Sequence, residues 1–118
     1  MELQIESGFR LGYNPLAVDY VALVGTPDWA IELKRDEFVS FRRLALELGE
    51  TMVLMESSLM DGETLSCELE CDDLWMEVEG YSTDYALRFI LHHGRRCEGE
   101  WPSAVSFVAA LAKLELGP

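Results

Sequence analysis

Basic residues are scarce in this chain of 118 residues. Nine Lys and Arg stand against 22 Asp and Glu, which gives a formal net charge of −13. A surface with so few cations repels phosphate backbones and anionic lipid surfaces. Nucleic acid and membranes are therefore partners that the composition disfavours, although a hydrophobic share of 49% is normal for a chain that folds.

Long hydrophobic runs and cysteines are also few. No apolar run approaches the roughly 18 residues of a membrane-spanning helix, and the opening MELQIESG lacks the basic start and apolar core of a signal peptide. Three cysteines without a framework spacing favour free thiols in a reducing compartment. We expect one cytoplasmic domain over residues 1–118, because this length is too short for two independent cores.

Motifs of known catalytic or cofactor sites are missing as well. No glycine-rich loop follows a predicted strand, and there is neither a nucleophile elbow nor a Cys–His signature. Cys67 and Cys71 would lie about 13 Å apart on a strand, whereas two ligands of one metal ion lie within about 4 Å. His92 and His93 would point to opposite faces, so only one of them could join Cys97. We predict no metal, no cofactor and no enzyme activity.

One segment, Asp36 to Gly62, is long and periodic enough to predict a helix. Its apolar residues recur at steps of three and four, on one side of the helix: Phe41, Ala45, Leu48, Met52, Met55 and Leu59. No capping box marks the start, and Asp61-Gly62 predicts the end. Gly49 should cost about 1 kcal/mol against alanine in mid-helix, so either a close neighbour needs the space or the helix bends there, and we favour close packing.

A second apolar row of this helix repeats every seven residues on a different flank: Val39, Leu46, Val53 and Met60. We expect this row to pack against another helix or another subunit, so that a monomer and a homodimer both remain open. The natural helical partner is a C-terminal helix from Pro102 to Leu116, with Gly117 and Pro118 at its exit. It is apolar almost all round, which predicts burial.

Eight segments carry strand patterns, four before the long helix and four after it: Glu2–Glu6, Phe9–Tyr13, Tyr20–Val24, Trp29–Leu33, Leu65–Cys71, Leu74–Gly80, Tyr85–His93 and Arg96–Trp101. The halves also share sequence, because Val39-Ser40-Phe41 recurs as Val105-Ser106-Phe107. We predict an α+β fold built as a tandem ββββα repeat of about 1–62 and 63–118. Its two antiparallel sheets would be related by a pseudo-two-fold axis, with a long central helix and a C-terminal helix.

Two resemblances follow. Residues 28–33 (DWAIEL), 74–81 (LWMEVEGY) and 94–102 (GRRCEGEWP) resemble those of a small uncharacterised cyanobacterial family, domain of unknown function 1818, over nearly the whole chain. That family implies no function. The tandem ββββα order is similar in topology to the Whirly proteins and to transcriptional coactivators that bind single-stranded DNA. This implies a nucleic-acid-binding regulator as the alternative function, although the basic and aromatic DNA-binding residues of those proteins have no clear counterpart here.

The outward face of the second predicted sheet is the most informative surface. It would gather the candidate binding residues Trp75, Glu77, Glu79, Tyr81, Arg88, Ile90 and Arg96, together with Glu98 and Glu100. Glu68 with Glu70, or Glu77 with Glu79, could form acid–base pairs, yet in so acidic a chain a solvated face is the commoner explanation. An exposed Trp among carboxylates would also suit a protein partner with a basic patch. We therefore predict a protein-binding or assembly-type module.

Overall fold

The computed structural model describes residues 2–6, 8–60, 62–92 and 96–116. The order ββββα occurs twice, with a short 3₁₀ turn between the two units: β1 (Glu2–Glu6), β2 (Phe9–Tyr13), β3 (Ala22–Gly25), β4 (Ala30–Leu33), α1 (Arg35–Met55), η1 (Glu56–Ser58), β5 (Leu65–Cys71), β6 (Leu74–Tyr81), β7 (Asp84–Leu91), β8 (Cys97–Trp101) and α2 (Val105–Lys113). Each unit forms an antiparallel sheet with its strands in chain order, β1-β2-β3-β4 and β5-β6-β7-β8. The predicted fold class is confirmed.

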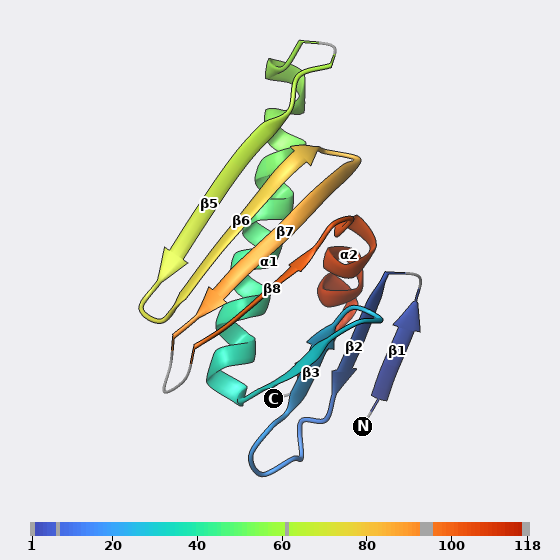
Figure 1. Ribbon diagram of the computed structural model, residues 1–118, viewed down its shortest axis with the longest axis vertical. Helices are drawn as coiled ribbons and strands as arrows, with labels where there is room; N and C mark the ends of the chain where they lie inside the picture. Colours follow the sequence, from blue (N-terminus) through green and yellow to red (C-terminus); the bar gives the residue numbers. More distant parts are fainter. Residues whose placement is uncertain (1, 7, 61, 93–95, 117–118) are drawn as a thin grey trace.

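The helix α1 organises the molecule. It runs behind the second sheet along the long axis, while α2 lies beside it near the first sheet (Figure 1). The molecule measures 47 by 30 by 29 Å. Neither helix, within the described part of the chain, has the length and apolar character needed to cross a membrane.

An aromatic cluster joins the two units at their centre. The Trp101 ring stacks on Phe107 at a centroid distance of 4.3 Å, and Phe41 and Phe107, which occupy equivalent places in the two units, lie 6.1 Å apart. The buried Trp101 indole donates a hydrogen bond to the Gly25 carbonyl at 2.8 Å. The two units therefore share one core.

A second long-range bond ties the first unit to the end of the second. The Tyr13 hydroxyl on β2 donates to the Leu116 carbonyl at 2.7 Å, across 103 residues of chain. The phenol ring itself is 7% exposed and packs 5.5 Å from Phe38 of α1. The segment after α2 is thereby fastened to the first sheet.

The long helix differs from its prediction at both ends. Lys34 precedes it, and the Glu37 carboxylate accepts a hydrogen bond from the Lys34 backbone N–H at 2.8 Å, so a capping interaction exists without a Ser or Thr. At the other end α1 stops at Met55, before Gly62, and continues only as the 3₁₀ turn. Met55 is 41% exposed, because no sheet covers the helix there. Leu59, the last member of the main stripe, lies beyond the helix and is half-buried. The other four members are buried as predicted: Phe41, Ala45, Leu48 and Met52.

The second apolar row is not covered by α2 along its length, contrary to the prediction. Val39 is 46% exposed, Val53 59% and Met60 76%, while Leu46 is half-buried and packs against the core. The alternative partner of this row, another subunit, stays a prediction.

The helix α2 contacts α1 at Arg42 and Gly49, four residues before and three residues after Leu46 on the same side of the helix. The missing side chain of Gly49 leaves room for this contact. A Cβ at position 49 would lie only 3.0 Å from Val108 Cγ1 and 3.1 Å from the Tyr85 hydroxyl. The close packing predicted for Gly49 is confirmed.

Smaller differences concern the ends of other elements. Strand β3 begins at Ala22 rather than at Tyr20. Trp29 precedes β4 because residues 26–29 form a turn in which the Thr26 N–H donates to the Trp29 carbonyl at 2.8 Å. The helix α2 begins at Val105, so Pro102 lies in the connection rather than at the first helical position. Ends predicted at Gly117, Pro118 and His93 lie outside the described residues.

Replacing Arg42 with methionine is expected to lower the free energy of unfolding by about 1.5 kcal/mol. The Arg42 Nε donates to the Leu111 carbonyl at 2.9 Å, and its Nη2 donates to the carbonyls of Ala112 and Leu114. The guanidinium thus caps the C-terminal end of α2, where a cation is favourable. Urea unfolding followed by circular dichroism measures the change. Arg43→Met is the matched control, because Arg43 has only an exposed contact with Glu47 at 4.0 Å. Equal losses in both variants would contradict a capping role.

Candidate functional site

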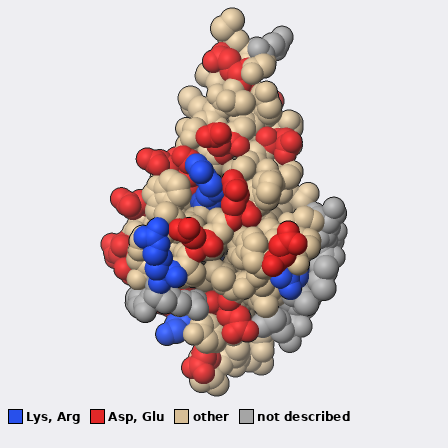
Figure 2. Space-filling view, viewed as in Figure 1, with Lys and Arg blue, Asp and Glu red and all other residues tan. Residues whose placement is uncertain are grey.

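The outer face of the second sheet brings together most of the predicted binding residues. In the strand register Trp75 is opposite Ile90, Glu77 is opposite Arg88, and Glu98 and Glu100 face the same two β7 residues from β8. We call this surface the acidic face and define it by Glu68, Glu70, Trp75, Glu77, Glu79, Arg88, Ile90, Glu98 and Glu100. Figure 2 shows that carboxylates gather over the side of the molecule seen there, with few basic groups among them.

Hydrogen bonds fix the central side chains of the acidic face. The Trp75 indole Nε1 donates to Glu68 Oε2 at 3.0 Å, and the Arg88 guanidinium donates to Glu77 in a salt bridge. The hydrogen bond from Arg88 to Glu77, and then the negative charge of Glu77, raise the pKa of Arg88 above its usual value. Among the described residues that define the face, Arg88 is the one guanidinium, and Glu77 engages it.

A hollow of about 500 Å³ opens on the acidic face beside the indole. Trp75 and Ile90 line it with apolar surface, and Glu98 and Glu100 line it with carboxylates; Arg88, Phe89 and Gly99 complete the lining. This combination of an aromatic ring with nearby carboxylates suits a cation that carries an apolar stem, such as a Lys or Arg side chain.

Four of the seven predicted site residues do not line this hollow. Glu77 and Glu79 line a smaller one on the same face, with Arg88 and Glu100, and the other two lie apart from the centre of the face. Tyr81, 46% exposed, lines a separate hollow at the other end of β6 together with Leu59 and Met60. Arg96 precedes β8 and forms an exposed ion pair with Glu98 at 3.2 Å, at the margin of the face. Trp75, Glu77, Glu79, Arg88 and Ile90 are brought together as predicted.

Sequence reasoning missed the role of Glu68 as the partner of the Trp75 indole. The signal was present, since the Asp72-Asp73 turn pairs Glu70 with Trp75 and Glu68 with Glu77. Residues two positions apart across an antiparallel pair lie within reach of a long side chain such as tryptophan. A register drawn from the predicted turn would have placed this carboxylate diagonally opposite the indole.

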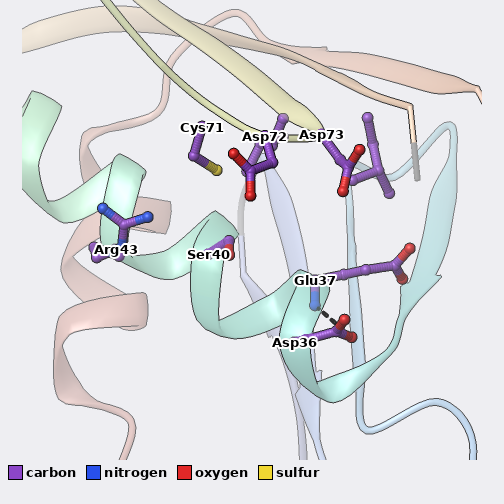
Figure 3. Close-up of a pocket in the computed structure, with 9 residues that line it drawn as sticks. Asp36, Glu37, Ser40, Arg43, Cys71, Asp72 and Asp73 are labelled. Atoms are coloured by element: carbon purple, nitrogen blue, oxygen red, sulfur yellow. Dashed lines mark hydrogen bonds between the residues drawn. The ribbon is translucent and has the colours of Figure 1, made fainter.

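Another hollow, of about 400 Å³, lies between the first turns of α1 and the β5–β6 turn (Figure 3). Asp36, Glu37, Asp72 and Asp73 line it with carboxylates. The Glu37 backbone N–H donates to Asp36 Oδ1 at 3.0 Å, which is a helix-capping contact. In the described part of the chain no group of three or more His, Cys, Asp and Glu side chains is arranged to hold a metal ion. We therefore assign these acids to the helix end and the turn.

The remaining chemistry-bearing side chains are dispersed or buried. Cys67 and Cys71 are half-buried free thiols, and Cys97 is half-buried at the start of β8. Tyr85 lies in the core, 4% exposed, and burial raises the pKa of its hydroxyl. Neither group lines the hollow beside Trp75.

Comparison with known proteins adds relatives without a known activity. Residues 4–114 match the profile of a family described as a domain of unknown function, DUF1818. The chain is also similar to the crystal structure of a protein with unknown function from the DUF155 family from Prochlorococcus sp. NATL2A, with 27% identity and a TM-score of 0.86 over 95% of this chain and 97% of that one. A search of curated proteins finds no match. Neither relative bears on the predicted resemblance to the Whirly proteins, which stays a prediction.

Proposed function

We propose a function from the surface chemistry of this chain, which belongs to the DUF1818 family, a domain of unknown function. The function is that of a non-enzymatic protein-binding module. Its acidic face would receive a basic surface of a partner protein. A Lys or Arg side chain of that partner would enter the hollow beside Trp75, with its stem on the indole and its charge near Glu98 and Glu100.

The observation that supports this function is the hollow itself. Tryptophan is the residue type most enriched among the energetically dominant positions of protein interfaces. Trp75 is held in place by Glu68, so that little side-chain freedom remains to be lost on binding. Among the described residues, six carboxylates against Arg88 on the face and Arg96 at its margin favour cationic surfaces: Glu68, Glu70, Glu77, Glu79, Glu98 and Glu100.

The same geometry gives no support to binding of single-stranded nucleic acid. Such sites place aromatic side chains among Lys and Arg, which hold the phosphates. Here the indole N–H is bonded to Glu68, and the nearest guanidinium is paired with Glu77. An electrophoretic shift with single-stranded DNA at low salt would revive that alternative, since low salt favours phosphate contacts.

Trp75→Ala is expected to weaken retention of the partner by about thirtyfold or more, the usual effect of removing a dominant interface tryptophan. Capture from the native cytosol on immobilised protein, quantified against wild type at several salt concentrations, measures this. The variant Glu98→Gln with Glu100→Gln should also retain less partner than wild type. This difference from wild type should grow as the salt concentration falls, because the lost attraction is electrostatic.

A matched control is Asp19→Asn with Glu115→Gln, which removes the same charge at two exposed positions outside the acidic face. It should leave retention close to wild type. Equal losses in the control and in the variants of the acidic face would mean that net charge alone, rather than this hollow, attracts the partner, and the proposed function would then fail.

A further inference from the structure

The end of α1 carries an exposed apolar surface that the acidic face does not include. Its members lie on the last turn of α1, the segment after it and the end of β6: Val53 59% exposed, Leu54 69%, Met55 41%, Met60 76% and Tyr81 46%. We call this surface the apolar tip. Five of the eight large hydrophobic side chains that are exposed in the described residues belong to it, so the exposure is concentrated rather than scattered.

The fold explains why these side chains are uncovered. The end of α1 and the 3₁₀ turn after it extend past the strands of the second sheet (Figure 1). A hollow of about 210 Å³ lies between this end and the β6–β7 turn, lined by Leu59, Met60 and Tyr81 with Glu56 and Glu63 at its margin. The apolar tip is therefore a ridge with a hollow beside it.

In the described residues the charges beside the apolar tip are acidic, apart from Arg43, whose guanidinium lies 4.0 Å from the Glu47 carboxylate. From Leu44 to Leu87 the chain contains no Lys and no Arg. Glu47 and Glu50 are exposed on α1 beside Val53 and Leu54, and the last turn of α1 carries no basic residue to offset the negative end of its dipole. An occupant of the tip therefore needs apolar side chains for the ridge and cations for its surroundings.

We propose that the apolar tip binds a cationic amphipathic helix of a partner protein. Leu46, Glu50, Val53 and Leu54 are spaced by four, three and one residues along one side of α1, which forms a ridge suited to a second helix. Apolar side chains of the incoming helix contact Val53 and Leu54, and its Lys or Arg side chains contact Glu47, Glu50 and Glu56. A second copy of this chain fits less well, because its own carboxylates would meet these.

This surface goes beyond the acidic face and has its own test. The probe is a synthetic helix of about 18 residues, five turns, in which leucines form one side and lysines the other. A peptide of the same composition in scrambled order, without an apolar side, controls for charge. Binding is measured by isothermal titration calorimetry, and sedimentation equilibrium reports the oligomeric state.

The substitutions Val53→Glu and Leu54→Glu separate apolar contact from charge. Each adds a carboxylate, so binding driven by charge alone would become tighter. The proposed contact predicts the opposite, binding weaker by about tenfold or more for the double variant, since two apolar side chains are lost. Val39→Glu is the matched control: it places the same change at a 46% exposed valine near the other end of α1 and should leave affinity unchanged or slightly higher.

Three results would overturn the proposal. The first is a higher affinity of the double variant than of wild type for the ordered peptide. The second is equal affinity of wild type for the ordered and scrambled peptides. The third is a wild-type dimer that dissociates in the variant Val53→Glu with Leu54→Glu, which would make the tip a contact between copies. Trp75→Ala should leave peptide affinity within about twofold of wild type. Failure here would therefore leave the function proposed for the acidic face intact, and the converse holds.

Discussion

Trp101→Ala is expected to lower the free energy of unfolding by about 3–5 kcal/mol, the usual range for truncating a fully buried tryptophan. The side chain is 0% exposed and lies against Trp29, Phe41, Phe89 and Phe107, at centroid distances between 4.3 and 5.9 Å. Truncation leaves a cavity where the two units meet, and it also leaves the Gly25 carbonyl without its indole donor. A loss of this size approaches the whole stability of a small domain.

The two contributions can be separated. Trp101→Phe keeps an aromatic ring but removes the donor, so we expect it to cost less than the alanine variant, about 1–3 kcal/mol. Thermal and urea unfolding followed by near-ultraviolet circular dichroism measure both. Trp75→Ala, on the surface, should cost less than either. A Trp101→Ala protein as stable as Trp75→Ala would show that the aromatic cluster does not hold the units together.

Gly25→Ala is expected to cost at least about 3 kcal/mol, more than ordinary overpacking. A Cβ at this position would lie 2.1 Å from the Trp29 carbonyl oxygen and 2.6 Å from the Ala30 Cα. Because both atoms belong to the backbone of the adjoining turn, no side chain can move aside. The β3–β4 pairing would have to open, and the Gly25 carbonyl would move away from Trp101.

Gly62→Ala provides the comparison for this substitution. Gly62 has φ +85° but nothing within 4 Å of an added Cβ, so its replacement carries only the cost of the left-handed backbone, about 1 kcal/mol. Urea unfolding of both variants measures the difference. The double variant Gly25→Ala with Trp101→Phe should lose less than the sum of the single losses, because both remove the same hydrogen bond. Additive losses would contradict a shared bond.

Most of the fold could be predicted because its patterns are local. Alternation of apolar and polar residues placed Met76, Val78, Leu87 and Phe89 on the inner face, and all four are buried. The end of α1 could not be read in this way. Apolar periodicity continues through Met55 to Leu59, but the sheet ends before those residues, and whether a surface is available to cover them is a tertiary property.

The extent of the contact between α1 and α2 was mispredicted for a similar reason. The row Val39, Leu46, Val53 and Met60 indicated a contact along its whole length, but only Leu46 of that row is half-buried. Helices instead approach where side chains are small or can reach across, and here Gly49 makes room for Val108 while Arg42 binds the end of α2. Neither residue stands out in a hydrophobic pattern.

The acidic face was predictable to the extent that strand register was. Trp75, Glu77, Arg88 and Ile90 face the same way because strands alternate strictly and the turns between them are short. Tyr81 also alternates correctly, yet it lies at the end of β6, next to Gly80 with φ +141°, and lines the hollow at the end of α1. Backbone geometry of that kind carries no signal beyond the glycine itself.

The bond from the Tyr13 hydroxyl to the Leu116 carbonyl has a consequence for the order of folding. Loop closure over 103 residues must precede this contact, and the Trp101–Gly25 bond requires closure over 76. Both sheets pair strands that are neighbours in the chain, so these two bonds are far more distant in sequence than the strand pairings and are expected to form after them. The first sheet should therefore acquire its native cover late, as the last step of a cooperative transition.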